Sequence, residues 1–184
     1  TIALGALTEE EKRIYTLVLR GHLQLGAAKF LHGCTGETLD MLARAPLWES
    51  GLDYNHGTGH GVGYMLSVHE GPNGIRWQRR VKSEDAAFAP GMITSDEPGI
   101  YIEGKYGVRH ENLVECVEAE PGSRYLEFRP ITFAPIDLDA IDEETLTEAT
   151  RRQLNAYHKE VYAKLAPNMR EEELSWLREY TREI

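Results

Sequence analysis

The sequence has few cysteines and no long apolar run. Its 184 residues include only two cysteines, Cys34 and Cys116. Two cysteines are too few for a disulfide framework, and these two do not form a closely spaced metal-binding pair. We therefore expect a reducing compartment and a cytoplasmic protein. No apolar run approaches the ~20 residues that a membrane span requires, so the sequence predicts no membrane partner.

Basic side chains are also in the minority. The chain has 20 Lys and Arg residues against 30 Asp and Glu residues, which gives a net charge of −10. Binding to nucleic acid depends on clustered Lys and Arg, so we exclude nucleic acid as a partner. The hydrophobic share of 41% and the charged share of 27% are typical of a globular protein with one sizeable core.

Aspartate is missing from the first part of the chain. None precedes Asp40, and the chain starts at Thr1 without Met. Residues 1–5 resemble the end of a strand more than a natural N-terminus. We expect a truncated product of a longer protein.

What the sequence does contain is a glycine-rich loop with histidines. Residues 56–63 are HGTGHGVG, and the apolar run that follows includes His69. His56 and His60 would share one face of a helix, but four helical glycines would cost roughly 3–4 kcal/mol. The glycines instead predict a tight loop whose backbone can approach a ligand closely.

Two other interpretations of this loop compete with a ligand-binding site. A phosphate-binding loop would need a preceding apolar strand and a following helix, and neither is visible. Ordinary loop or core histidines are the usual interpretation of any single histidine. Three of them close to one glycine-rich loop favour a histidine-based site.

Elsewhere the pattern predicts alternating helices and strands. Thr8 and Glu11 form a capping box for a helix over residues 9–30, and Thr35 caps the next helix. Leu47 and Trp48 are expected in the core. Strands are predicted over residues 92–97, 100–102 and 107–117, two short ones over 124–133, and helices around 154–165 and 174–180.

A boundary is predicted after Pro135, where the acidic segment 137–144 begins. We expect residues 1–135 to form one domain and residues 136–184 a helical extension packed on it. Trp176 and Tyr180 would be costly to leave in water, so this extension should dock. It is also our candidate for a homodimer contact.

Two acids stand out because they lie within strand-forming segments. An ionised carboxylate there is costly unless it is paired or binds a metal. Glu111 has an equally good alternative, as a surface residue or as a partner of Arg109. Together with a loop histidine, however, Glu97 and Glu111 offer nitrogen and oxygen ligands without thiolate. That set suits a divalent ion, with Mn favoured and Co or Zn as alternatives.

Four motifs in this order resemble one family. They are HGTGHGVG at 56–63, VHEGP at 68–72, SDEPG at 95–99 and VRHENLV at 108–114. The combination is similar to the catalytic domain of aminopeptidase P, the Xaa-Pro aminopeptidase of the pita-bread metallopeptidases. The resemblance runs from Thr1 into the last helices, which are similar to those of the long, three-domain form. It implies an α+β pita-bread fold.

The resemblance also implies roles for these side chains. His60 and Glu97 would bind one ion of a dinuclear pair, and Glu111 would bridge both ions. Such a pair holds a hydroxide and stabilises the oxyanion formed when an amide is hydrolysed. His56 would contact the substrate near the scissile bond, and His69 would hydrogen-bond to the substrate carbonyl or shuttle a proton.

Two further positions follow from the same resemblance. Arg109 would orient the neighbouring carboxylate, Glu111. His110 stands where many relatives carry an aliphatic residue. Strand alternation should point its side chain away from the metal, so we interpret it as packing.

One part of the family pattern is absent. The family needs two Asp ligands upstream of the first helix, and Thr1 would follow the second of them. Asp40 and Asp53 do not match their spacing or context. The sequence therefore predicts part of a metal-dependent aminopeptidase that cleaves peptides with proline at the second position, and predicts that residues 1–184 alone are inactive.

Two rival functions stay open. One is a prolidase-like dipeptidase on the same fold, which a comparison of dipeptide and tripeptide substrates would distinguish. The other is a catalytically dead peptide-binding module. The presence of His60, Glu97 and Glu111 disfavours that module for the longer protein, and the missing aspartates favour it for these residues alone.

Overall fold

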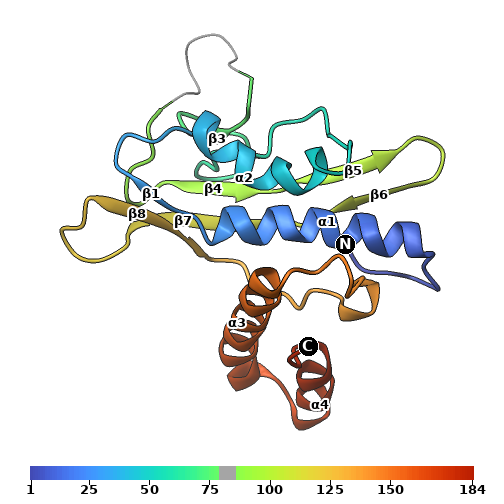
Figure 1. Cartoon of the computed structure of the whole chain (residues 1–184). Helices are drawn as coiled ribbons and strands as arrows, with labels where there is room; N and C mark the ends of the chain where they lie inside the picture. Colours follow the sequence, from blue (N-terminus) through green and yellow to red (C-terminus); the bar gives the residue numbers. More distant parts are fainter. Residues whose placement is uncertain (79–85) are drawn as a thin grey trace.

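The computed structural model describes residues 1–78 and 86–184. Its centre is a long helix, α1 (Glu9–Gly26), which lies along a curved set of antiparallel strands (Figure 1). The capping box is present: the Thr8 side chain accepts from the Glu11 amide, and the Glu11 side chain accepts from Thr8. The second helix, α2 (Gly36–Trp48), packs against α1 and carries Pro46 near its end.

In the described residues, the strands form one four-stranded sheet and two short pairs. The four-stranded sheet has the order β1-β8-β7-β4, and the pairs are β2-β3 and β5-β6. An isolated bridge between Gly61 and Thr94 joins the β2 segment to β4. The strands are β1 (Lys29–Leu31), β2 (Gly59–His60), β3 (Gly74–Ile75), β4 (Ile93–Asp96), β5 (Gly99–Ile102), β6 (Tyr106–Arg109), β7 (Asn112–Glu118) and β8 (Tyr125–Pro130).

The chain ends in helices that lie below α1 in Figure 1, α3 (Glu148–Leu165) and α4 (Glu171–Tyr180). Two 3-10 turns, η1 (Leu138–Ala140) and η2 (Ala166–Asn168), precede and follow α3. Leu138 and Leu154 share a buried cluster with Tyr15 and Val18 of α1. The C-terminal segment therefore packs into the same core as the first helix.

Two apolar clusters hold the elements in place. The first lies between α1, the β5-β6 pair and the C-terminal segment. The second fills the space between α1, α2 and the four-stranded sheet, and includes Phe30, Phe88 and Phe128. Within the described ranges, no helix has both the length and the apolar character needed to cross a bilayer.

Several expected boundaries were wrong. The first helix ends at Gly26, not near residue 30, because residues 29–31 pair with β8 instead. Trp48 is 40% exposed, whereas Leu47 is fully buried as expected. The strand predicted over 107–117 is broken at His110 and Glu111, and its two halves join different sheets. Residues 125–130 form one strand, not two.

Candidate metal and catalytic site

The break in the strands has a matching break on the neighbouring segment. Asp96 and Asn112 are the last partners of the β4-β7 ladder. Gly99 and Arg109 are the first partners of the β5-β6 ladder. Each of the two neighbouring segments therefore leaves one sheet and enters another at the same level. Glu97 lies in the gap between β4 and β5, and Glu111 lies in the gap between β6 and β7.

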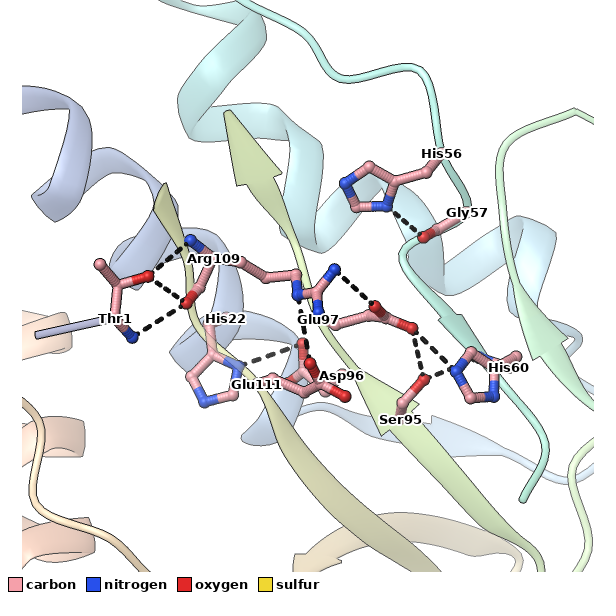
Figure 2. Close-up of polar contacts among 10 residues, drawn as sticks. All are labelled: Thr1, His22, His56, Gly57, His60, Ser95, Asp96, Glu97, Arg109 and Glu111. Carbon is pink, nitrogen blue, oxygen red and sulfur yellow. Dashed lines mark hydrogen bonds and ion pairs between the residues drawn. The ribbon is translucent and has the colours of Figure 1, made fainter. Parts of the chain in front are cut away.

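Glu97 is held by groups from two strands. Its Oε1 atom lies 3.1 Å from Nε2 of His60 and accepts a 2.9 Å hydrogen bond from Oγ of Ser95 (Figure 2). Ser95 in turn accepts the backbone amide of His60 at 3.0 Å. The Glu97 residue is only 9% exposed, so these contacts replace most of its hydration.

His60 is oriented through its other ring nitrogen. Nδ1 lies 3.0 Å from the carbonyl of Gly61, and a ring nitrogen that faces a carbonyl must carry the proton. Nε2 is therefore the ring nitrogen left to face Oε1 of Glu97. A metal-ligating histidine usually has this kind of outer hydrogen bond. The His69 ring is 4.2 Å from that of His60, and the residue is exposed.

Arg109 lies between the two candidate acids, as Figure 2 shows. Its Nε is 3.2 Å from Oε2 of Glu111, and its Nη1 is 3.7 Å from Oε2 of Glu97. Burial acts to lower the pKa of this guanidinium, but a hydrogen bond with Tyr101 and the charge of Glu111 raise it overall. The pairing of Glu111 with Arg109, one of the alternatives from the sequence, is thus present.

The N-terminal residue lies beside the same strand. The hydroxyl of Thr1 donates a 2.8 Å hydrogen bond to the carbonyl of Arg109 and accepts a 2.9 Å hydrogen bond from the backbone amide of the same residue. The terminal ammonium also donates to that carbonyl at 3.1 Å. Thr1 therefore contacts the residue that lies two positions before Glu111 in the sequence.

His56 belongs to the same cleft but to a different wall. Its Nδ1 donates to the carbonyl of Gly57 at 2.8 Å, and its ring packs between Tyr54 and Tyr101. Its Nε2 is buried and has no hydrogen-bond partner among the described residues. An imidazole nitrogen without a partner is available to a ligand in the cleft.

The cleft has a volume of about 410 Å³. His56, His60, His69, Glu97 and Arg109 all line it, whereas Glu111 reaches it only through Arg109. Among the residues that the structure describes, no three His, Cys, Asp or Glu side chains converge closely enough to hold a metal ion. Five of the six predicted site residues are therefore together, and the guanidinium separates Glu111 from the His60-Glu97 pair.

The donor set itself fits a divalent cation. It consists of the imidazole of His60 and the carboxylates of Glu97 and Glu111, without a thiolate. Such nitrogen and oxygen donors suit Mn, Co or Zn. The aspartates of this region are engaged elsewhere: Asp40 and Asp53 both bind Arg44, and Asp96 faces His22 at 3.3 Å.

Asp96, the residue directly before Glu97, faces His22 of α1. Asp96 is 1% exposed, and burial raises the pKa of its carboxyl. His110, also buried, packs edge-on against Tyr15 at 4.4 Å, and burial lowers the pKa of its imidazole well below the usual value. His110 thus packs against α1.

Sequence reasoning missed Ser95 and Tyr101. Ser95 contacts both His60 and Glu97, and the available signal was its position two residues before Glu97. Tyr101 packs on His56 and contacts Arg109. Nothing in its local sequence distinguishes it from an ordinary strand tyrosine.

The chain matches two family models. Residues 1–118 match Metallopeptidase family M24, and residues 124–184 match the C-terminal region of peptidase_M24. A probable Xaa-Pro aminopeptidase P from Pyrenophora tritici-repentis is 45% identical over 181 residues, which cover 95% of this chain and 30% of that protein. The chain therefore spans about 30% of the length of this curated relative.

Solved structures agree with this similarity. A crystal structure of X-prolyl aminopeptidase from Caenorhabditis elegans, described as a cytosolic enzyme with a di-nuclear active site, matches with a TM-score of 0.87 and 38% identity. The match covers 97% of this chain and 29% of that one. An Xaa-Pro dipeptidase from Bacillus anthracis matches with a TM-score of 0.61 and 34% identity, over 74% of this chain and 35% of the dipeptidase.

Proposed function

Since the chain belongs to metallopeptidase family M24, we propose that it forms part of the catalytic centre of an Xaa-Pro aminopeptidase. The substrates would be peptides with proline at the second position. The observation that carries the proposal is the His60-Glu97-Ser95 cluster, in which Nε2 of His60 and Oε1 of Glu97 lie 3.1 Å apart in a cleft. The chemistry of this cluster supports a metal-dependent hydrolase.

His60 and Glu97 would bind one divalent ion, and Glu111 would bridge it to a second, with Mn favoured over Co or Zn. When bound, such a pair activates water and stabilises the negative charge that develops on a hydrolysed amide. Arg109 contacts both acids, which supports its role in orienting Glu111. Displacement of its guanidinium would accompany metal binding.

His56 and His69 would act on the substrate. The free Nε2 of His56 is available to the peptide near its scissile bond. His69 is exposed and lies beside His60, where it could hydrogen-bond to the substrate carbonyl or carry a proton. Both roles need a neutral imidazole for part of the cycle.

The two remaining ligands implied by the resemblance would be aspartates from outside these 184 residues. Asp40 and Asp53 already bind Arg44, which makes them unsuitable. Thr1 lies against Arg109, whose side chain contacts Glu111. On this basis residues 1–184 alone would be inactive.

We propose the same two-part organisation as the sequence predicts, with residues 1–135 as catalytic region and 136–184 as helical extension. The shared cluster of Leu138 and Leu154 with α1 supports docking of the extension. Trp176, 48% exposed on α4, is a candidate for a homodimer contact. A cytoplasmic location is supported by the relative described as cytosolic.

A prolidase-like dipeptidase is the second candidate, because an Xaa-Pro dipeptidase shares the fold over 74% of the chain. The aminopeptidase is favoured because its match extends over 97%, including the C-terminal helices. A full-length chimera would decide, in which these 184 residues replace the matching part of the fungal relative. We expect it to cleave an Xaa-Pro-Xaa tripeptide in preference to an Xaa-Pro dipeptide.

Metal binding can be tested on the chain itself. Titration calorimetry with Mn²⁺ should detect weak binding that Glu97→Gln reduces at least tenfold, because a carboxylate ligand is lost. Glu103→Gln, at an exposed acid in the β5-β6 turn, is the matched control. Equal affinity in both variants would contradict the proposed ligand set.

A further inference from the structure

A buried ion pair on α2 lies close to the loop that carries His56. Arg44 is 1% exposed and Asp40 is fully buried, and Nε of Arg44 donates to Oδ2 of Asp40 at 2.6 Å. The two residues are four apart, so they stack on successive turns of the helix. Burying such a pair is costly unless the remaining donors and acceptors are also satisfied.

The remaining donors of Arg44 bind the segment that leads to His56. Nη1 donates to Oδ1 of Asp53 at 2.6 Å and to the carbonyl of Tyr54 at 2.7 Å. Nη2 donates to the carbonyl of His56 at 2.8 Å. The guanidinium also lies 3.8 Å over the Tyr54 ring. Arg44 therefore fixes the backbone of this loop up to His56 itself.

The other oxygen of Asp40 holds the far side of the same loop. Oδ1 accepts a 2.5 Å hydrogen bond from the hydroxyl of Thr58. The hydroxyl of Tyr54 lies 2.5 Å from that of Thr58 and can donate to it. The loop is thus bound on both sides of His56 by two side chains from one helix.

Thr58 connects this arrangement to a candidate metal ligand. Its backbone carbonyl accepts the amide of Glu97 at 2.8 Å. The next residue, Gly59, packs so closely that a Cβ there would lie 1.9 Å from the carbonyl of Ser95. A displacement of Thr58 would therefore move Glu97 and the strand that carries His60.

We propose that Asp40 and Arg44 are positioning residues that hold His56 and, through Thr58, Glu97 in their working geometry. The inference rests on the proposed function for the roles of His56 and Glu97, but the contacts exist independently of it. Asp40 is fully buried. Arg44 borders the cleft but is 1% exposed, and its nitrogens already bind Asp40, Asp53 and the loop carbonyls, so both residues act through the loop. Their effect is to remove the freedom of a glycine-rich loop that would otherwise sample many conformations.

A matched pair of variants isolates the smallest element of this network. Thr58→Val has nearly the same shape and lacks the hydroxyl, whereas Thr58→Ser keeps it. Arg44→Lys keeps the charge and loses the planar fork of donors. Arg13→Lys, at an exposed position on α1, is the control for that change.

Two measurements on the folded 184-residue chain report the geometry without activity. Hydrogen exchange of the Glu97 amide measures its bond to Thr58, with the Val161 amide in α3 as an internal reference for global unfolding. Long-range ¹H–¹⁵N spectra measure whether the His56 ring stays in the form with the proton on Nδ1, which Gly57 selects.

In Thr58→Val and Arg44→Lys we expect the hydrogen-exchange rate of the Glu97 amide, relative to that of the Val161 amide, to rise at least tenfold. Each variant should also populate both neutral forms of the His56 ring. Thr58→Ser and Arg13→Lys should match the unmodified chain. Unchanged exchange and an unchanged ring form in Thr58→Val would overturn the proposal, as would equal effects of Thr58→Val and Thr58→Ser. Should Arg44→Lys fail to fold, the Thr58 pair decides alone.

Mn²⁺ titration of the same variants separates this inference from the proposed function. If the unmodified chain binds no Mn²⁺, the assigned ligand set fails, and the exchange data still decide whether Asp40 and Arg44 position the loop. If it binds, Thr58→Val should weaken affinity about tenfold, as loss of an outer-shell contact does. Unchanged affinity would overturn the link from Thr58 to Glu97.

Discussion

Asp96 and Asn112 face each other as the last pair of the β4-β7 ladder. Beyond this pair both strands change sheets, and the ladder resumes at Gly99 and Arg109. The residues in the gap include Glu97 and Glu111, the two candidate carboxylate ligands. Because the two adjacent strands break at the same level, Glu97 and Glu111 lie close together although they belong to separate sequence motifs.

Ser95→Ala should weaken metal binding without unfolding the chain. The hydroxyl joins the amide of His60 to Oε1 of Glu97, so its loss frees both groups to move. We expect Mn²⁺ affinity to fall roughly 10–100-fold, as for other outer-shell contacts. Calorimetry measures this effect, and Ser175→Ala on exposed α4 is the control. Unaltered affinity in Ser95→Ala would remove Ser95 from the site.

His69→Ala should lower turnover and leave the metal content intact. The side chain is exposed beside His60 and has no metal-binding role in the proposed mechanism. In the full-length chimera we expect kcat to fall by ~10²–10⁴-fold if His69 carries a proton. Elemental analysis alongside kinetics checks both parts. Loss of metal in this variant would instead indicate that His69 is a ligand.

Leu154→Ala should destabilise the whole chain. Leu154 is fully buried in the cluster that joins α3 to α1, so the change leaves a cavity between the two parts. We expect the free energy of unfolding to fall by about 2–5 kcal/mol. Urea denaturation measures it, with Leu4→Ala at a fully exposed position as the control. Two separate transitions, with only one affected, would show that the extension folds independently.

Acid should weaken the attachment of α3 through His158. Burial lowers the pKa of this imidazole to about 4, and its Nε2 accepts the amide of Ile136 at 3.0 Å. The unfolded state, with a histidine pKa of about 6.5, binds the proton first. Stability from this group is therefore complete above pH 6.5 and is lost as the pH falls toward 4.

His158→Gln removes this titration and keeps an acceptor for Ile136. From pH 7.5 to 5.0 the unmodified chain should lose about 2 kcal/mol more than the variant in free energy of unfolding. Urea denaturation at the two pH values gives both numbers, and the acidic groups common to both proteins cancel. Parallel losses would mean that His158 is protonated or exposed in the folded chain.

The sequence predicted the family, and five of the six site residues that it singled out line one cleft. The resemblance to aminopeptidase P and the α+β pita-bread fold are confirmed. HGTGHGVG at 56–63 was informative because its four glycines disfavour a helix. In a glycine-rich loop, two histidines are more readily explained by a ligand than by packing. The assignment of metal ligands and catalytic histidines stays a prediction.

What the sequence could not predict depends on distant contacts. The apolar pattern continues through His110 and Glu111, so nothing local indicates that the strand changes sheets there. Arg44 lies on a regular helix, and apart from Asp40 on the same helix its partners are loop atoms that no pattern in the sequence identifies. The apolar side chain of Trp48 predicted a core position, but Trp48 is the last residue of α2 and its ring packs edge-on against that of Trp77 at the surface.

Glu111→Gln in the full-length chimera tests the central claim most directly. The chimera is depleted of metal, restored with Mn²⁺ and assayed for release of the first residue from an Xaa-Pro-Xaa peptide. We expect Mn²⁺-dependent hydrolysis in the unmodified chimera and in Glu103→Gln. In Glu111→Gln turnover should fall by at least about 10³-fold, because the change would remove the ligand that we propose both ions share. A Glu111→Gln enzyme with two bound metals and near-normal turnover would contradict the proposed site.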